Sequence, residues 1–305
     1  MLKKAFQKAI IYDHFAKPAE FKIGGTTKAK SGCGFFFTIV LIALVLFIFI
    51  QSTITMYKRK DPTVNIIETV VDDPPEVSLS TLTMAFGLSP INSLIEIKAN
   101  SHFTISAILS ISESITNDGT GGYRTRRESL QIEPCTKEYF GEMAEEFLEI
   151  IEDPTVLFCL PRDQPNLSLR GKSGSSVVTT ISLYFYECLD TLAGCAPDIE
   201  REEVLSLVKY NFYYADSFTD TTDYKSPIKK TRQYDIEYLN RGQYSRRQTQ
   251  LLPVKILSDE GVIFQQDKEQ NDLFIGDKHL SISSEEYNTE PGLLFEQVFL
   301  LSDRV

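Results

Sequence analysis

Histidine and metal-binding motifs are scarce in this sequence. The chain of 305 residues has only three histidines, His14, His102 and His279, and it has no Cys-x-x-Cys motif. A zinc site or a histidine-based catalytic triad would have to use His102 and His279, because His14 lies on the other side of a long apolar run. No cysteine is paired with a histidine at ligand spacing. The sequence therefore predicts no metal site and no cofactor.

Motifs for phosphate binding, nucleophilic catalysis and calcium binding are incomplete. The Gly171-Lys172-Ser173 stretch resembles the end of a phosphate-binding loop, but Asn166 stands where that loop needs a glycine. The same stretch lacks the Gly-x-Ser-x-Gly pattern of a nucleophile elbow. A calcium loop would begin at Asp267, yet Lys278 stands where a glutamate must close the shell. We therefore expect a protein without enzymatic activity.

A concentrated cationic surface of the kind that binds nucleic acid is also lacking. The net charge is −11, and the hydrophobic content of 42% with 24% charged residues is typical of a folded chain rather than a disordered one. The first 32 residues carry seven lysines against two acidic residues, so the acidity belongs to the rest of the chain. This balance argues against a nucleic-acid partner for the large domain.

What the sequence does contain is one long apolar run. Residues 33–50 are uninterrupted by charge, and a mildly polar continuation reaches Met56. At a rise of 1.5 Å per residue, such a segment covers the hydrocarbon core of about 30 Å. We expect four regions: a basic cytoplasmic segment (residues 1–32), a transmembrane helix (33–56), a linker with a first strand (57–75) and a β-rich exoplasmic domain (76–305).

The lysines before the apolar run orient it. Under the positive-inside rule they place the N-terminus in the cytoplasm, although Lys58, Arg59 and Lys60 lie on the opposite flank. We expect a single-pass protein of the plasma membrane or endomembranes, with the mitochondrial inner membrane as the alternative. Apolar residues at near-helical spacing in the first segment, from Leu2 to Phe15, suit a short helix on anionic membrane lipid.

The number of cysteines in the large domain is consistent with an oxidising compartment. Cys33 lies in the apolar run, which leaves an even number in the large domain: Cys135, Cys159, Cys188 and Cys195. Three pairings exist, and we favour the local one, Cys135 with Cys159 and Cys188 with Cys195. Four buried thiols are the alternative. Asn166, in an Asn-Leu-Ser sequon, is a candidate glycosylation site.

Alternation of apolar and polar residues predicts a mainly β (α+β) domain, a multistranded antiparallel sandwich with two short helices. The alternation is clearest from Phe103 to Ser112 and from Val177 to Tyr186. Further expected strands are Thr63 to Val71, Val77 to Phe86, Ser93 to Lys98, Lys209 to Tyr214, Pro253 to Ser258, Val262 to Gln265 and Leu293 to Leu301. The expected helices are Lys137 to Glu152, opened by Thr136, and Ile199 to Val208, opened by Asp198.

A run of basic residues stands out in the otherwise acidic domain. It comprises Lys225, Lys229, Lys230, Arg232, Arg241, Arg246 and Arg247. Such residues suit lipid headgroups, the acidic face of a partner or the acidic remainder of the same domain. A solvated hairpin without a partner is the simplest alternative.

Several short sequence motifs occur in a fixed order along the chain. They are Asp13-His14-Phe15, Pro134-Cys135, Phe158-Cys159-Leu160, the Cys188 and Cys195 pair, and the stretch from Ser258 to Ile263. In this arrangement, with Gly171 between them, the chain resembles a group of uncharacterised ciliate membrane proteins over most of its length. Members of that group often continue into a second membrane helix. The resemblance implies an N-terminal membrane helix and a cysteine-bearing β domain, and it implies no activity.

Two functions agree with these features. The first is a membrane-anchored, non-enzymatic interaction or structural protein, whose exoplasmic β domain binds a protein partner or a sister subunit as a homo-oligomer. The second is a subunit of a ligand-gated channel or receptor that has a second membrane helix. An exoplasmic enzyme would need paired acids that the sequence does not supply.

Overall fold

A computed structural model of the chain describes residues 18–23, 26–28, 32–58, 67, 73–74, 76–91, 96–115, 122–165, 167–172, 174–189, 194–206, 208–223, 226–241, 243–259, 267–284 and 292–302. The chain divides into two units, residues 1–64 with 261–265, and residues 65–260 with 266–305. The first unit contains the apolar helix. The second contains the β domain.

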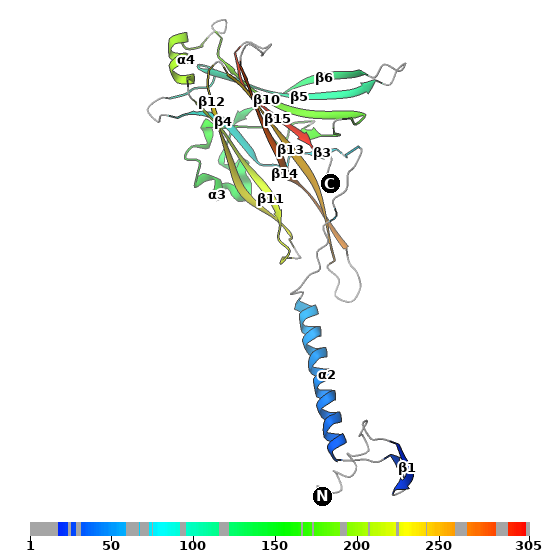
Figure 1. Ribbon diagram of the computed structural model, residues 1–305. Coiled ribbons are helices and arrows are strands. Elements are labelled where there is room, and N and C mark those ends of the chain that lie inside the picture. The colour runs from blue at the N-terminus through cyan, green and yellow to red at the C-terminus, as the bar shows by residue number, and fades with distance from the viewer. Residues whose placement is uncertain are drawn as a thin grey trace. The chain divides into compact units, whose positions relative to one another are not determined.

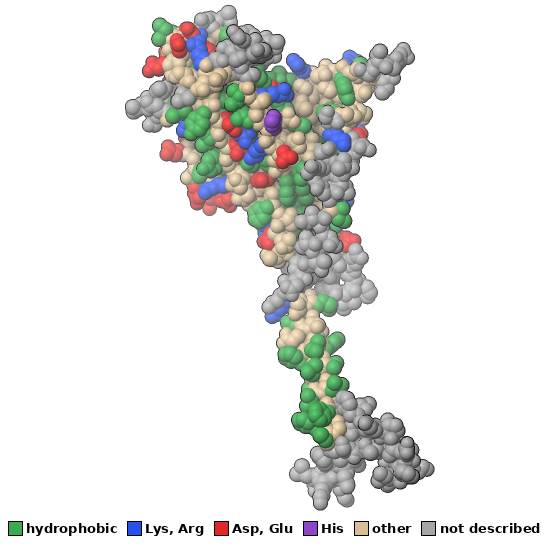
Figure 2. Space-filling model, in the orientation of Figure 1, with side chains coloured by type: hydrophobic (Ala, Val, Ile, Leu, Met, Phe, Trp, Pro, Cys, Tyr) green, Lys and Arg blue, Asp and Glu red, His purple; other side chains and the backbone are tan. Residues whose placement is uncertain are grey.

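The described part of the first unit has a short hairpin and one long helix. Strands β1 (Pro18–Ile23) and β2 (Thr26–Lys28) pair antiparallel, and helix α2 spans Gly32–Lys58. Two hydroxyl groups in α2 donate back to carbonyl oxygens four residues earlier, Thr38 to Gly34 and Thr53 to Phe49, so they add no unsatisfied polar group to the apolar helix. Its visible surface is largely hydrophobic (Figure 2). The helix expected over residues 2–15 lies outside the described residues.

Two sheets face each other in the second unit (Figure 1). The six-stranded sheet has the order β14-β13-β15-β10-β5-β6, and the five-stranded sheet has the order β12-β11-β4-β8-β7. Their strands are β4 (Met84–Pro90), β5 (Phe103–Ile115), β6 (Gly122–Leu130), β7 (Glu133–Pro134), β8 (Phe158–Cys159), β10 (Val177–Glu187), β11 (Val208–Thr219), β12 (Ile228–Leu239), β13 (Gln243–Asp259), β14 (Asp267–Ser284) and β15 (Leu293–Leu301). A separate small sheet pairs β3 (Val77–Ser78) with β9 (Ser168–Leu169).

The expectation of a mainly β sandwich is confirmed, with one departure from a purely antiparallel arrangement. Strands β13 and β15 are parallel, whereas the neighbouring pairs are antiparallel. The long β14 between β13 and β15 in the chain makes this possible, because it returns the chain to the end of the sheet where β13 began. Pro253, which has no N–H to donate, lies in β13 just beyond Leu251, the last residue paired with β15.

Most of the expected strands are present, with altered limits. The strands expected at Phe103, Val177, Lys209 and Leu293 are confirmed as β5, β10, β11 and β15, and Pro253 to Ser258 is the end of the longer β13. The segment from Val77 to Phe86 is two strands, β3 and the start of β4, separated by a turn at Ser80 and Thr81. Residues 96–98 are not a strand; Val262 to Gln265, and Thr63 to Val71 except Ile67, lie outside the described residues.

The expected helix over Lys137 to Glu152 is wrong as a continuous helix. The structure has a 3-10 helix η2 at Lys137–Met143 followed by the short α3 at Ala144–Leu148. Gly141 breaks the segment because its φ of 56° is left-handed, a conformation that glycine adopts without steric cost. The second helix is present as α4 (Asp198–Leu205), but it is shorter than expected, since Val208 already begins β11, and its N-cap is Pro197 rather than Asp198. A further 3-10 turn η3 covers Pro154–Val156.

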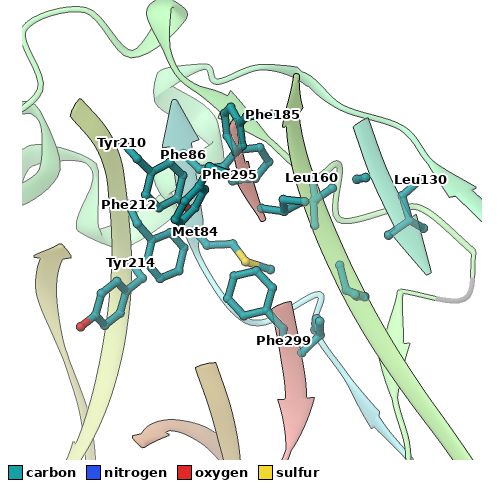
Figure 3. Packing of buried hydrophobic residues seen from close by; sticks show 14 of the residues in the cluster. Met84, Phe86, Leu130, Leu160, Phe185, Tyr210, Phe212, Tyr214, Phe295 and Phe299 are labelled. Carbon is teal, nitrogen blue, oxygen red and sulfur yellow. The ribbon is translucent and has the colours of Figure 1, made fainter. Parts of the chain in front are cut away.

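The main hydrophobic core lies between the two sheets (Figure 3). Tyr210 of β11 lies 4.1 Å from Phe295 of β15, and Phe212 lies 5.6 Å from Phe299, measured between ring centroids. All four rings are buried. The aromatic contacts therefore join β11 of one sheet to β15 of the other.

A second, smaller core lies on the outer face of the five-stranded sheet, beneath η2 and α3. Phe140 and Phe147 pack with ring centroids 4.9 Å apart, over Ala85 of β4 and Ala215 of β11. The apolar stripe of the η2–α3 segment faces this core. The layer covers β4 and part of β11.

Candidate interaction site

The basic run expected from the sequence does not form a single patch. Its described members contact groups of the same domain: Lys229 pairs with Asp223, Arg232 with Glu149, Arg241 with Glu187, Arg246 with Glu296 and Arg247 with Asp235, while Lys230 donates to the carbonyl of Thr81. Lys225 lies outside the described residues. Of the partners considered from the sequence, the acidic remainder of the domain is therefore the one these basic residues meet within the chain.

The most buried of these ion pairs joins the two sheets at one side of the sandwich. Arg247 of β13 is 5% exposed, and its Nη2 and Nη1 lie 2.7 Å from Asp235 and 3.0 Å from Glu237, both on β12. Lys278 of β14 also pairs with Asp235 at 2.7 Å, and its ammonium lies 4.4 Å from the centre of the Tyr214 ring. We call these five residues the edge cluster.

Burial and charge act against each other in the edge cluster. Burial raises the pKa of Glu237 above that of an exposed glutamate, and the nearby Arg247 offsets only part of this. Burial lowers the pKa of Lys278, but its hydrogen bonds to Asp235 and Tyr214 outweigh that effect and leave the pKa raised. The cluster is a structural clamp between β12 and the other sheet, because each arginine and lysine in it is engaged by a carboxylate.

A second charged group lies near the N-terminal end of α4. Glu187 accepts from Arg201 at 3.2 Å and from Arg241 at 2.7 Å, and Arg241 also reaches Asp198 at 2.6 Å. The hydrogen bond to Arg241 is the main reason that the pKa of Asp198 is lowered, and the bond to Glu187 is the main reason that the pKa of Arg241 is raised. We call these four residues the end cluster.

A hollow of about 480 Å³ opens beside the end cluster. Its lining is Glu187, Glu202, Ser206, Arg241, Gln243, Gly292, Leu293 and Leu294. Its one arginine is already bound by Glu187 and Asp198, so an anion entering the hollow would compete with two carboxylates.

The two local disulfides favoured from the sequence are present in the structure. The sheet disulfide joins Cys135 to Cys159 with Cα atoms 5.1 Å apart, and it ties the end of β7 to β8 beneath the η2–α3 layer. The loop disulfide joins Cys188 to Cys195 with Cα atoms 5.6 Å apart, directly after β10. Cys33 in α2 is a free thiol.

The buried His102 forms hydrogen bonds within the turn next to the loop disulfide. His102 accepts from the backbone N–H of Lys98 at 3.0 Å, and its other ring nitrogen lies 3.2 Å from Glu200 of α4. Its backbone carbonyl accepts from the N–H of Cys188. His102 therefore links the turn, the disulfide and α4. No group of histidine, cysteine and acidic residues suited to a metal ion occurs among the described residues.

The candidate glycosylation site has no structural description. Asn166 lies outside the described residues, whereas Leu167 beside it is buried and Ser168 opens β9. The hydroxyl of Ser168 is hydrogen-bonded to Glu76.

Three exposed apolar side chains lie in a row on β12, the outermost strand of the five-stranded sheet. Tyr234, Ile236 and Tyr238 are 56%, 40% and 63% exposed, and they point to the outer face because strand residues two apart share a side. Tyr213 of β11 lies beside Tyr234, with ring centroids 6.3 Å apart. We call Tyr234, Ile236 and Tyr238 the outer stripe.

The outer stripe is a feature that sequence reasoning missed. The segment draws attention by its charge, although Tyr234, Ile236 and Tyr238 alternate with Asp235 and Glu237 at the period of two that marks a strand. The alternation is real but inverted: the charged residues point inward to Arg247, and the apolar residues point outward. The period of two therefore identifies the strand correctly, but it would place the apolar side chains of the strand on the inner face, which is wrong.

Comparison with known protein families gives a match over most of the β domain. The family model described as "Uncharacterised 80 kDa protein N-terminal domain" matches residues 85–302, which extend from β4 through the end of β15 and make up more than half of the chain. No curated protein matches the chain.

Proposed function

The chain belongs to the family of the uncharacterised 80 kDa protein N-terminal domain, and we propose that it is a membrane-anchored, non-enzymatic interaction protein. In this proposal α2 spans the membrane, and the β domain binds a protein partner or a sister subunit. The observation that carries the proposal is the outer stripe, because three neighbouring apolar side chains on an edge strand are costly to leave in water and tyrosine is enriched in protein interfaces.

The anchor is supported by the length and composition of α2. Among the described residues, Cys33–Lys58 is the one helix long and apolar enough to cross a membrane, and 11% of its apolar window is buried within the chain. A core helix of a soluble domain would be covered by its own protein. The resemblance to ciliate membrane proteins is in line with this reading.

The proposed location of the β domain is exoplasmic, in the plasma membrane or endomembranes. Two disulfides suit an oxidising compartment, and the lysine-rich segment before α2 suits the cytoplasm. In sealed vesicles with their cytoplasmic face outward, added protease should remove the N-terminal segment and leave the β domain intact. Digestion of the domain in intact vesicles would contradict this orientation.

The absence of enzymatic activity is proposed from the use of the charged groups. The arginines of the edge and end clusters are held by carboxylates at 2.6 to 3.2 Å, so they act as clamps rather than as free groups facing a substrate. Breaking either cluster to bind a ligand would leave charges without partners in a poorly solvated place. We assign the two clusters to folding and the outer stripe to binding.

The interaction is tested by the size of the complex extracted from native membranes. The full-length protein in mild detergent should migrate on a native gel as a species larger than its monomer. A variant with Tyr234→Ser, Ile236→Ser and Tyr238→Ser should migrate as a monomer, and Ile282→Ser on β14, where the side chain is 61% exposed, should leave the complex intact. A stripe variant that migrates as the wild type would contradict the proposal.

A further inference from the structure

The outer edge of β12 lacks effective protection against pairing. Its ladder with β11 runs without a register shift from Val208–Leu239 to Thr219–Ile228, and no described strand pairs with its other edge. Natural sheets protect open edges with charged side chains, especially lysine, and with proline, bulges or inward-pointing charges. The two lysines of β12 are engaged within the chain, Lys229 by Asp223 and Lys230 by the carbonyl of Thr81. β12 has no proline and no bulge, and its inward charges, Asp235 and Glu237, are neutralised by Arg247. The edge is therefore left competent to accept another strand.

The order of charges along β12 identifies the strand that fits. The first half carries Lys229, Lys230 and Arg232, and the second half carries Asp235 and Glu237. When such a strand meets a copy of itself in the antiparallel direction, the basic half of each lies beside the acidic half of the other. Directly opposed unlike charges stabilise a strand pair, and like charges destabilise it.

The pleat of the strand restricts the register. Outward residues must face outward residues, so the twofold axis has to pass through a residue of β12. An axis at Gln233 places Lys229 opposite Glu237 on the inner face. The two side chains keep their partners Asp223 and Arg247 within the chain, and they are 37% and 24% exposed, so they can also meet across the pair. An axis at Tyr234 would place Lys229 opposite Leu239 and would align no unlike charges. An axis at Arg232 would place Lys229 opposite Asp235, but it would also set the two Arg232 side chains against each other.

The register about Gln233 also covers the outer stripe. On the outer face, Arg232 of each copy lies opposite Tyr234 of the other, which is a favourable cation–aromatic pairing. Lys230 lies opposite Ile236, where its aliphatic stem can cover the exposed side chain. Exposed tyrosine and isoleucine surface on one copy is thus matched by basic side chains on the other.

We propose that β12 is a homodimer interface, in which the β12 strands of two copies of this chain pair antiparallel about a twofold axis at Gln233. The five-stranded sheets of the two copies become one continuous sheet. The inference rests on the proposed function, because it names a second copy of the chain as the partner of the outer stripe.

Disulfide trapping in membranes tests the register. The full-length chain carries Cys33→Ser, so that its free thiol is removed, together with Gln233→Cys on the exposed edge. Facing Cα atoms in an antiparallel pair lie about 4.5 to 5.5 Å apart, within reach of a disulfide, so mild oxidation should give a covalent dimer. The control is Thr231→Cys, whose copies would lie about 13 Å apart along the strands at 3.3 Å per residue. Equal or absent linking at the two positions overturns the proposal.

A second variant checks that the link reports the interface. Adding Ile236→Lys to the Gln233→Cys chain places a second cation opposite Lys230 and should reduce the dimer at least tenfold, whereas adding Ile282→Lys on β14 should leave it unchanged. Both side chains are exposed in the folded domain, at 40% and 61%, so neither change disturbs the core. Loss of the dimer with both variants, or with neither, contradicts the proposed interface.

The outcome is distinguishable from failure of the proposed function. If the triple serine variant of the outer stripe no longer forms the native complex, while Gln233→Cys gives no covalent dimer, the stripe binds a protein other than a second copy. The proposed function then stands, and the homodimer is refuted. A covalent dimer through Gln233→Cys that fails with Thr231→Cys and is lost with Ile236→Lys establishes the second copy as the partner.

Discussion

Removing Arg247 should destabilise the β domain more than removing any exposed basic residue. The Arg247 side chain is 6% exposed, and its two carboxylate partners, Asp235 and Glu237, are 23% and 24% exposed. An Arg247→Met change keeps much of the aliphatic stem and leaves both carboxylates without their main partner. Breaking a buried ion pair from one side costs about 3 to 5 kcal/mol.

The expected loss lies at the lower end of that range. Lys278 still pairs with Asp235 at 2.7 Å, so Glu237 is the group left without a cation. We therefore expect Arg247→Met to lower the free energy of unfolding by about 3 kcal/mol. Adding Glu237→Gln to this variant should recover part of the loss, because it removes the orphaned charge.

The same strand offers a matched control. Lys255 of β13 pairs with Glu269 at 2.8 Å, but the two side chains are 50% and 47% exposed. Because solvent screens such a pair, Lys255→Met should cost less than about 1 kcal/mol.

Urea unfolding of the detergent-solubilised full-length protein, followed by tyrosine fluorescence, measures both changes. The midpoint should shift strongly for Arg247→Met and little for Lys255→Met, with unchanged slopes. Equal shifts for the two variants would refute the reasoning that burial of the edge cluster sets its contribution. Failure of Glu237→Gln to recover stability would refute the assignment of the loss to the orphaned carboxylate.

Three further predictions concern the core, the disulfides and pH. Tyr210→Phe should change the free energy of unfolding by less than about 1 kcal/mol or raise it, because the hydroxyl is buried and has no hydrogen-bond partner among the described residues; a loss above 2 kcal/mol would show a hidden partner. Replacing both cysteines by alanine should cost about 3.4 kcal/mol for the sheet disulfide and about 2.4 kcal/mol for the loop disulfide, since the closed loops span 24 and 7 residues, and thermal unfolding should rank them in that order. The pKa of Glu237 is raised in the folded state, so the folded chain binds this proton more readily than the unfolded chain. The ionised carboxylate therefore lowers the free energy of unfolding at neutral pH, and this loss is relieved as pH falls through the folded pKa. The change in the free energy of unfolding caused by Glu237→Gln should therefore be more favourable at pH 7 than at pH 4.5 in unfolding titrations, and an equal effect at both would contradict the shift.

The sequence predicts those parts of the fold that depend on local pattern. The apolar helix needs only an uninterrupted run, and β5 and β10 show alternation because one face is buried in the core. The loop disulfide is predicted because its two cysteines are 7 positions apart in the sequence and Gly194 lies between them.

Other parts depend on contacts between distant segments, which no local pattern reports. β12 has charged residues on its inward face, and only the position of Arg247 on β13 explains why they are tolerated there. The same holds for the helix broken at Gly141, since a glycine within an apolar period does not reveal whether its φ is positive. For the same reason the sequence leaves open whether the basic run meets lipid headgroups, a partner or the same domain, because carboxylates that pair with it, such as Glu187 on β10 and Glu296 on β15, are distant along the chain.

Photo-crosslinking at the outer stripe tests the central claim, that this β domain is a protein-binding module on a membrane anchor. Tyr238, which is 63% exposed, is replaced by benzoylphenylalanine in the full-length chain in native membranes, and Tyr123 on β6, which is 56% exposed, is replaced in the same way as a control. The account predicts a light-dependent adduct between Tyr238's replacement and a protein, with none from Tyr123's replacement. No protein adduct at position 238, or equal adducts at both positions, would contradict it.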